Sequence, residues 1–239
     1  MTEDIATETA NRLFAAERAQ AYDWRIRQAI PGYEALHVLS CTIVAEATGG
    51  HGRVLVAGAG TGAECVALAQ ACPTLTIVGV DPSTEMLAVA ERKVAEHDLV
   101  ARVRLIPGTI GGLPAFEKYD AATLLLVLHF LADDGAKARV LADVAARLKP
   151  GGALVLADLF GPDWSDSWQS HLRTCWGHLQ RAAGIAEADI AKGFAHVDRD
   201  IHPVEESRLT ELLAEAGFEP PRPFFRALCF GGWLARKRS

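Results

Sequence analysis

Residues 54–64, "VLVAGAGTGAE", decide the fold. Four apolar residues are typical of a strand buried on both faces, and Gly58, Gly60 and Gly62 then form a tight turn in front of a helix. Strand–turn–helix units of this kind bind nucleotide cofactors in several α/β folds. The dinucleotide fingerprint G-x-G-x-x-G needs its third glycine at position 63, where this chain has Ala63. The turn by itself therefore leaves the identity of the cofactor open.

Composition limits the class of protein. The chain has 239 residues, of which 50% are hydrophobic and 23% are charged, which suits one globular α/β domain. Its net charge of −6 does not favour nucleic acid. The acidic N-terminus has no continuous apolar segment, the longest apolar run is too short to span a bilayer, and the five cysteines are scattered. We expect no nucleic-acid partner, no membrane and a cytoplasmic location.

Apolar runs and amphipathic segments alternate after the glycine turn. The predicted strands are 53–57, 76–80, 102–106, 120–128 and 153–159, and the predicted helices are 33–47, 83–98, 133–148 and 206–218. This alternation indicates βαβ units and a parallel sheet. Residues 2–22 predict a further helix, residues 161–205 a helical insertion, and residues 223–237 two short β segments.

Asp81 narrows the choice of cofactor. It follows the second predicted strand and lies 19 residues after Gly62. An acidic side chain at this place can accept hydrogen bonds from both ribose hydroxyls of an adenosine. NAD and S-adenosylmethionine both contain such a ribose, so Asp81 indicates an adenosine cofactor without choosing between them.

The order of the motifs resembles class I S-adenosylmethionine-dependent methyltransferases. The glycine turn, Asp81 and "LKPGGALVLAD" occur in that order, and a terminal β pair follows "LLAEAGF". The resemblance covers roughly residues 30–235. It implies S-adenosyl-L-methionine as cofactor, S-adenosyl-L-homocysteine as product, and an α/β, Rossmann-like sheet of seven mostly parallel strands with an antiparallel last strand. The single domain, 1–239, would comprise an N-terminal helical cap (1–50), a cofactor-binding core (51–160), a helical insertion or second cap (161–205) and a C-terminal helix with the β pair (206–239).

Three segments resemble one branch more closely. "IPGYE", "LHFLADDGAKARVLADVAARLKPGGALVLAD" and "LQRAAGIAEADIAK" look like carboxy-S-adenosylmethionine synthase, which works in tRNA wobble-uridine modification. This likeness implies that Tyr33 folds over the cofactor, that Asp81 binds its ribose, and that the insertion supports a homodimer. The other implied cofactor contacts are Gly58, Ala59 and Gly60 at the methionine part, Thr109 and Ile110 along the adenine, and Gly62, Pro82 and Leu125 beside them.

The chain departs from both patterns. Many methyltransferases carry an acidic residue two positions before the first glycine, where this chain has Val56. In the synthase an arginine pairs with the extra carboxylate of its product. Phe194 aligns with that arginine, and Lys192 and Arg199 are the nearest cations in the sequence. Because a buried carboxylate without its donors is costly, we favour ordinary methyl transfer.

Candidate acceptor-side residues come from the fourth strand and the two caps. His129 follows the fourth predicted strand, where a neutral imidazole could take a proton from the acceptor; its alternative role is structural. An aromatic substrate pocket is predicted from Tyr22, Trp24, Phe160, Trp164, Trp168 and Phe194. The alternative for these rings is a cap core or a subunit interface.

The leading hypothesis is methyl transfer to an O, N or S atom of a small, partly aromatic metabolite. The alternatives are a carboxy-S-adenosylmethionine synthase-like enzyme, a catalytically silent adenosine-binding protein and a nucleotide-dependent oxidoreductase. His171, Cys175 and His178 could share one helix face, but no fourth ligand is evident, so we expect no metal.

Overall fold

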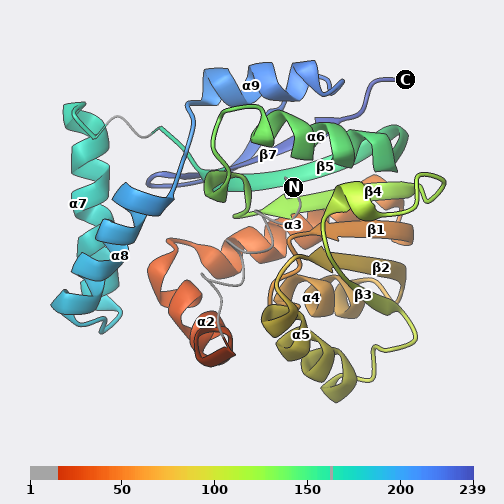
Figure 1. The fold of residues 1–239 in the computed structure, drawn as a ribbon, viewed down its shortest axis with the longest axis horizontal. Helices are drawn as coiled ribbons and strands as arrows, with labels where there is room; N and C mark the ends of the chain where they lie inside the picture. Colours follow the sequence, from red (N-terminus) through yellow and green to blue (C-terminus); the bar gives the residue numbers. More distant parts are fainter. Residues whose placement is uncertain (1–15, 162–163) are drawn as a thin grey trace.

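The structure, a computed structural model, describes residues 16–161 and 164–239 and consists of one sheet with helices on both faces (Figure 1). The strands are β1 (His51–Ala57), β2 (Thr74–Asp81), β3 (Val103–Pro107), β4 (Tyr119–Leu125), β5 (Leu148–Leu159), β6 (Arg222–Ala227) and β7 (Phe230–Arg236). The α-helices are α2 (Ala16–Ala29), α3 (Tyr33–Thr48), α4 (Ala63–Ala71), α5 (Thr84–Glu96), α6 (Ala136–Arg147), α7 (Ser167–Ala182), α8 (Glu187–Asp200) and α9 (Glu206–Glu215). Two short 3-10 helices are η1 (Ile110–Gly112) and η2 (Leu128–Phe130).

The sheet has seven strands in the order β3-β2-β1-β4-β5-β7-β6. Strands β1 to β5 are parallel, and β7 runs antiparallel to both β5 and β6. This confirms the predicted mostly parallel sheet with an antiparallel last strand. Because β1 lies between β2 and β4, the strand order reverses there, and in open α/β sheets the crevice for a ligand forms at that point, beyond the carboxyl ends of the strands.

Alternating side chains of each strand fill two cores. Leu55 and Leu124 pack with apolar side chains of α6 and α9 on one face. Val54 and Val56 pack with those of α3, α4 and α5 on the other face. In the described ranges no helix combines the length and the hydropathy that a bilayer crossing requires.

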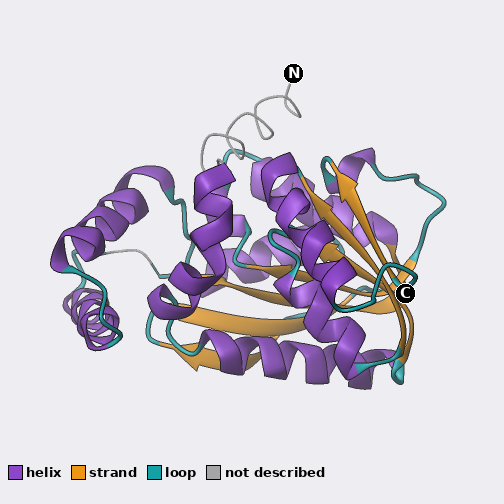
Figure 2. Ribbon diagram, turned by 90° about the horizontal axis from the view of Figure 1, so that it is seen from below, coloured by secondary structure: helices purple, strands orange, loops and turns teal. Residues whose placement is uncertain are grey.

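Helices α7 and α8 form a cap that stands at one end of the sheet (Figures 1 and 2). A third apolar cluster joins this cap to the body, with Trp176 of α7 against Tyr33, Leu126 and Phe230. The Trp176 Nε1–H also donates to the backbone carbonyl of Ala29 at 2.5 Å. The cap therefore packs beside α2 and the carboxyl ends of β4 and β5.

Three predicted boundaries were wrong or incomplete. Strand β4 ends at Leu125 rather than at 128, because Leu126 turns into the left-handed region at φ 59° while staying buried. The helix predicted over 133–148 begins only after Gly135, and Leu148 already belongs to β5. The first helix reaches Ala29, and the part predicted over 2–15 lies outside the described residues.

Candidate active site

The glycine turn bends sharply after β1. Gly58, Gly60 and Gly62 have φ values of 77°, 52° and 77°, a region that side chains disfavour. A Cβ at Gly58 would lie 2.4 Å from Val127 Cγ2, and one at Gly62 would lie 2.8 Å from Ala90 Cβ. These two glycines are therefore required by the packing of the protein itself.

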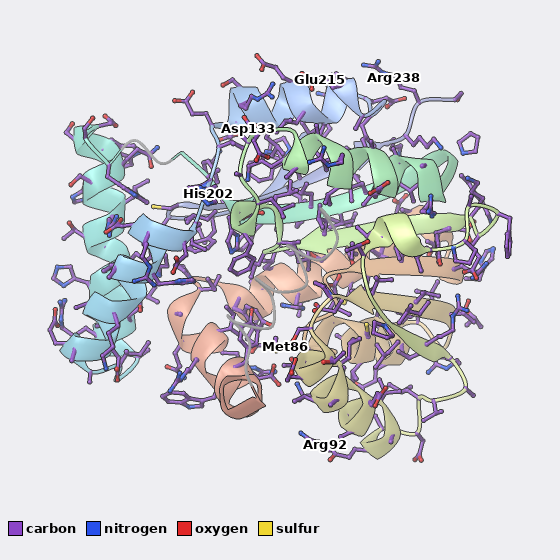
Figure 3. The ribbon with its side chains drawn as sticks, in the orientation of Figure 1. Met86, Arg92, Asp133, His202, Glu215 and Arg238 are labelled. Atoms are coloured by element: carbon purple, nitrogen blue, oxygen red, sulfur yellow. The ribbon has the colours of Figure 1, made fainter. Side chains whose placement is uncertain are left out.

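Gly60 differs from the other two glycines. Among the described residues, a Cβ there would meet only the Met86 methyl group, at an ordinary 3.5 Å. Met86 lies in the first turn of α5 (Figure 3). The backbone of Gly60 is thus the open part of the turn, where a ligand can come close.

Asp81 joins the end of β2 to this turn. Its Oδ2 accepts the Gly60 N–H at 2.8 Å, and its Oδ1 accepts the Ser83 N–H at 2.8 Å. Burial raises the pKa of Asp81, and the two N–H groups offset part of the rise. A carboxylate has about four acceptor positions. Asp81 can therefore accept further hydrogen bonds from ribose hydroxyls, and Asp81 with Gly60 fits the adenosine part of the predicted cofactor.

The loop predicted to line the adenine follows β3. The Gly108 N–H donates to the Asp81 carbonyl at 3.0 Å, and Ile110 is buried at the start of η1. The buried Arg147 donates through Nη2 to the carbonyls of Gly111 at 3.0 Å and Leu113 at 2.6 Å. This contact could not be predicted from the sequence, because Arg147 lies 36 and 34 residues from its partners.

Helix α2 lies against the glycine turn. The Asp23 carboxylate accepts hydrogen bonds from the Thr61 hydroxyl and from Lys93 of α5. Burial raises the pKa of Tyr22 above its usual range, and the nearby Asp81 carboxylate adds to the rise. Sequence reasoning placed Tyr22 in the substrate pocket and missed Asp23, whereas the structure brings both close to the predicted cofactor site.

His129 has a partner that the sequence did not reveal. Its Nδ1 is hydrogen-bonded to the Asp158 carboxylate, whose other oxygen accepts the His129 backbone N–H at 3.1 Å. Because a carboxylate accepts, Nδ1 carries the proton in the neutral ring and Nε2 keeps its lone pair. Within residues 16–161 and 164–239, Nε2 makes no hydrogen bond. The buried Lys137 holds Leu128, the residue before His129, by donating to its carbonyl at 2.5 Å.

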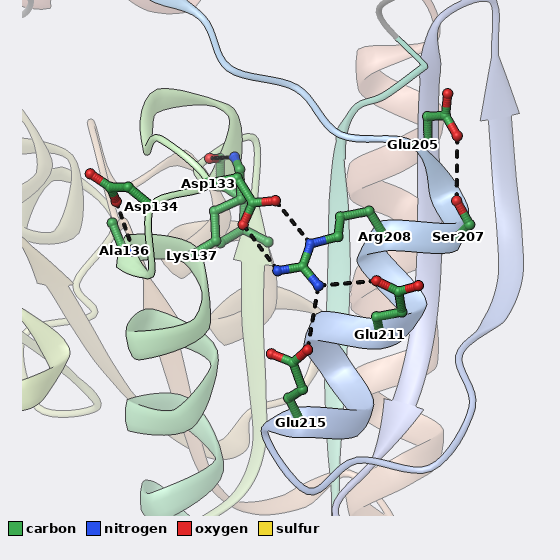
Figure 4. Close-up of polar contacts among 10 residues, drawn as sticks. Asp133, Asp134, Ala136, Lys137, Glu205, Ser207, Arg208, Glu211 and Glu215 are labelled. Carbon is green, nitrogen blue, oxygen red and sulfur yellow. Dashed lines mark hydrogen bonds and ion pairs between the residues drawn. The ribbon is translucent and has the colours of Figure 1, made fainter.

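The loop that follows η2 is held by α9. Arg208 Nε donates to Asp133 Oδ2 at 2.9 Å, and Nη1 of the same guanidinium contacts Glu211 and Glu215 at 3.0 and 3.3 Å (Figure 4). This network ties the chain just beyond His129 to the body of the domain.

The aromatic residues predicted for the substrate pocket fall into separate groups. Trp164 and Phe194 lie together, because the Arg173 guanidinium stands 4.8 Å and 4.7 Å from their ring centres. Arg173 also forms a forked ion pair with Asp198, at 2.5 and 2.7 Å. Trp176 packs edge-on against Phe194 at 5.2 Å.

The other predicted aromatic residues lie apart from this pair. Phe160 is buried against Trp233 on the α6–α9 side, beside a cavity of about 10 Å³ that His129 and Asp158 also line. Trp24 and Trp168 are each 61% exposed.

The two cations expected nearest to Phe194 are surface groups. Lys192 pairs with Asp189 at 3.1 Å, and Arg199 pairs with Asp200 at 2.6 Å. Arg173 is instead the cation in contact with the Phe194 ring. Within the described residues no three His, Cys, Asp or Glu side chains are grouped as a metal site.

Comparisons with known proteins agree with this geometry. Residues 54–152 match the family described as "Methyltransferase domain". The chain is 27% identical over 226 residues to the carboxy-S-adenosyl-L-methionine synthase of Methylococcus capsulatus, covering 94% of this chain and 93% of that protein. It is 29% identical over 191 residues to the demethylmenaquinone methyltransferase of Deinococcus radiodurans, covering 78% and 76%.

A solved structure shares the fold. The putative O-methyltransferase of Nostoc punctiforme superposes with a TM-score of 0.66 at 18% identity, over 93% of this chain. This chain spans only 60% of the length of that solved chain.

The sheet order, the glycine turn with Asp81 and the matched domain define the class I S-adenosylmethionine-dependent methyltransferases. The chain is an S-adenosylmethionine-dependent methyltransferase of this class, and S-adenosyl-L-methionine is its cofactor. Both had been predicted from the order of the sequence motifs.

Proposed function

We propose that this enzyme transfers the methyl group to an O, N or S atom of a compact, partly aromatic metabolite. The observation that supports a proton-accepting role is the His129–Asp158 pair. His129 follows β4 and Asp158 is the penultimate residue of β5, so both lie at the carboxyl ends of parallel strands. S-adenosylmethionine supplies, when bound, a methyl group on a cationic sulfur, which is a strong electrophile. The task of the protein is then to orient the acceptor and to remove its proton.

In this proposal His129 accepts the proton of the acceptor through Nε2. Asp158 holds the ring in the tautomer that leaves Nε2 unprotonated, and its charge stabilises the imidazolium that forms. Lys137 positions the pair by fixing the Leu128 carbonyl from within the core.

The acceptor would lie between the crevice and the cap. Trp164 and Phe194 offer flat apolar surface there, and the apolar cluster beneath them includes Tyr33 and Trp176. Such surroundings favour a partly aromatic molecule over a highly charged one.

A second candidate function is synthesis of a carboxylated S-adenosylmethionine, as in the relative from Methylococcus capsulatus. That relative matches nearly the whole chain, which favours this candidate. Against it, Phe194 aligns with the arginine expected for the carboxylate, and the guanidinium beside it, Arg173, is already paired with Asp198. These contacts support ordinary methyl transfer.

Transfer of a labelled methyl group to a panel of phenols, amines and thiols tests the proposal. With an active acceptor, His129→Gln should lower kcat by about 10²–10⁴-fold and leave S-adenosylhomocysteine binding unchanged. His97→Gln, a substitution at the exposed end of α5, serves as the matched control and should behave as wild type. The proposal is wrong if no acceptor takes the label and mass spectrometry finds a carboxylated cofactor after incubation with keto acids.

A further inference from the structure

Three polar side chains on α3, α4 and β4 are buried. Ser40, Glu64 and Thr123 are 1%, 7% and 0% exposed. Ser40 Oγ, Glu64 Oε1 and Thr123 Oγ1 make no hydrogen bond within the described part of the chain. Leaving a buried acceptor unpaired is costly, and more so for a carboxyl group, so these oxygens call for a partner that residues 16–161 and 164–239 do not supply with ordinary hydrogen-bond geometry.

The cluster lies on the α3–α4 side of β1. Glu64 is the second residue of α4 and lies two positions after Gly62. Thr123 of β4 is the register partner of Val56 in β1, and Val56 faces α3 and α4. Ser40 belongs to α3, the helix that packs against both β4 and α4. Glu64 of α4 therefore lies on the side of β1 that Val56 faces, and the Val56 side chain offers no polar group there.

Two buried acids therefore lie on the two elements next to the turn. Asp81 of β2 binds the Gly60 N–H, and Glu64 lies in the first turn of α4, near Thr123 of β4. Burial raises the pKa of Tyr33, and the neighbouring Tyr22, Asp23 and Glu64 add to the rise; Tyr22 itself lies close to Asp81. Tyr22 thus lies near Asp81, Tyr33 lies near Glu64, and the two tyrosines lie near each other.

The two acids, Asp81 and Glu64, suit different parts of the cofactor. Its ribose presents neutral hydroxyls, which suit Asp81. Its amino-acid part presents an ammonium, which offers up to three hydrogens and a positive charge, as a lysine ammonium does. The sulfonium is also positive but has no hydrogen to donate. A buried carboxyl group with an unpaired acceptor oxygen is satisfied by the ammonium and not by the sulfonium.

We propose that Glu64 binds the ammonium group of the cofactor's amino-acid part. Glu64 takes this role from α4, in a chain whose β1 carries Val56 where many methyltransferases have an acid. The hydroxyls of Thr123 and Ser40 steady the carboxylate once it is ionised. The competing explanation is a structural acid that only fills space between α3 and α4.

Proton release provides a readout independent of activity. Burial raises the pKa of Glu64 to about 7. The nearby Thr123 hydroxyl offsets part of this rise, although the two side chains share no hydrogen bond of ordinary geometry. Tyr33 and Cys41 of α3 and the adjacent Cys65 are the other titratable groups that interact with Glu64, and burial raises all three pKa values far above neutrality. Binding an ammonium near pH 6.5 should therefore expel a proton from Glu64.

Calorimetry with two ligands tests the proposal. S-adenosylhomocysteine has the ammonium and lacks the sulfonium charge, whereas 5′-methylthioadenosine lacks the whole amino-acid part. Glu64→Gln should weaken the binding of S-adenosylhomocysteine by about 10–100-fold and change the affinity for 5′-methylthioadenosine by less than about two-fold. It should also remove the proton release that accompanies binding, which is measured in buffers of different ionisation enthalpy. Glu46→Gln is the matched control, because its side chain is 76% exposed on α3, and it should bind both ligands as wild type.

Three results would overturn the proposal. One is unchanged S-adenosylhomocysteine affinity, and another is an equal loss for both ligands, which would mean that Glu64 only supports the turn. The third is a loss confined to S-adenosylmethionine, which would assign Glu64 to the sulfonium. If the glutamine variant does not fold, Glu64→Asp retracts the carboxylate by one methylene and must show the same selective loss for S-adenosylhomocysteine.

Discussion

The cofactor half of the sheet and the helical cap hold their charged groups in different ways. Asp81 and Arg147 are buried, and each binds two backbone groups of the cofactor loops. In the cap, Arg181 and Arg199 pair with carboxylates at the surface. A buried charge bonded to backbone fixes a loop, whereas exposed ion pairs contribute little to stability. The predicted cofactor site is therefore held by buried charges on backbone groups, whereas these charges of the cap are paired at its surface.

The largest expected effect concerns the buried acid Glu64. Its pKa of about 7 in the folded protein exceeds the ordinary 4.5, so the folded state binds the proton more tightly. The stability of the cofactor-free protein should fall by about 3 kcal/mol as the pH rises from 4.5 to 7, at 1.36 kcal/mol per pKa unit. Glu64→Gln should lack this decline, which urea unfolding at pH 5 and pH 8 would measure. The same decline in both proteins would contradict the assignment.

Asp81→Asn tests the ribose side of the cofactor half. The amide has one acceptor oxygen where the carboxylate has two, so it cannot satisfy Gly60, Ser83 and the ribose together. S-adenosylhomocysteine binding should weaken by about 1.5–3 kcal/mol. Asp98→Asn, at an exposed position past α5, is the control that should leave affinity unchanged. Wild-type affinity in a folded Asp81→Asn protein would refute the ribose assignment.

Arg147→Met tests whether backbone contacts hold the adenine loop. The substitution leaves the Gly111 and Leu113 carbonyls without their donor, so we expect a loss of about 1–3 kcal/mol in stability. Hydrogen exchange of residues 108–113 should become faster. Unchanged exchange in this loop would show that its position does not depend on the guanidinium.

Arg173→Met should have the smallest effect on stability of these substitutions. It therefore tests the contrast between buried charges in the cofactor half and the charges of the cap. Arg173 pairs with Asp198, which is 50% exposed, and lies over the Trp164 and Phe194 rings. We expect a loss of about 1 kcal/mol or less, reduced further by salt. Thermal unfolding at low and high salt would measure it. A loss larger than that of Arg147→Met would contradict the contrast between core and cap.

Local spacing allowed only the nearby elements of the candidate site to be predicted from the sequence. The glycine turn and Asp81 stand at short, fixed distances along one βαβ unit, and their geometry follows from that unit. Asp158 lies 29 residues from His129, and Asp23 lies 38 residues from Thr61, so only the folded chain reveals these contacts. The end of β4 was misplaced for a related reason: Leu126 remains buried while its backbone leaves the strand, and hydrophobicity cannot report that.

Competition between S-adenosylmethionine and its carboxylated analogue for the wild-type protein tests the central claim most directly. Phe194 occupies the position aligned with the synthase arginine, and Arg173 beside it is already paired with Asp198. A carboxylate placed there would lack a free partner. We predict that S-adenosylmethionine binds more tightly, and that Phe194→Arg moves the preference toward the analogue. Tighter binding of the carboxylated form by the wild type would contradict ordinary methyl transfer.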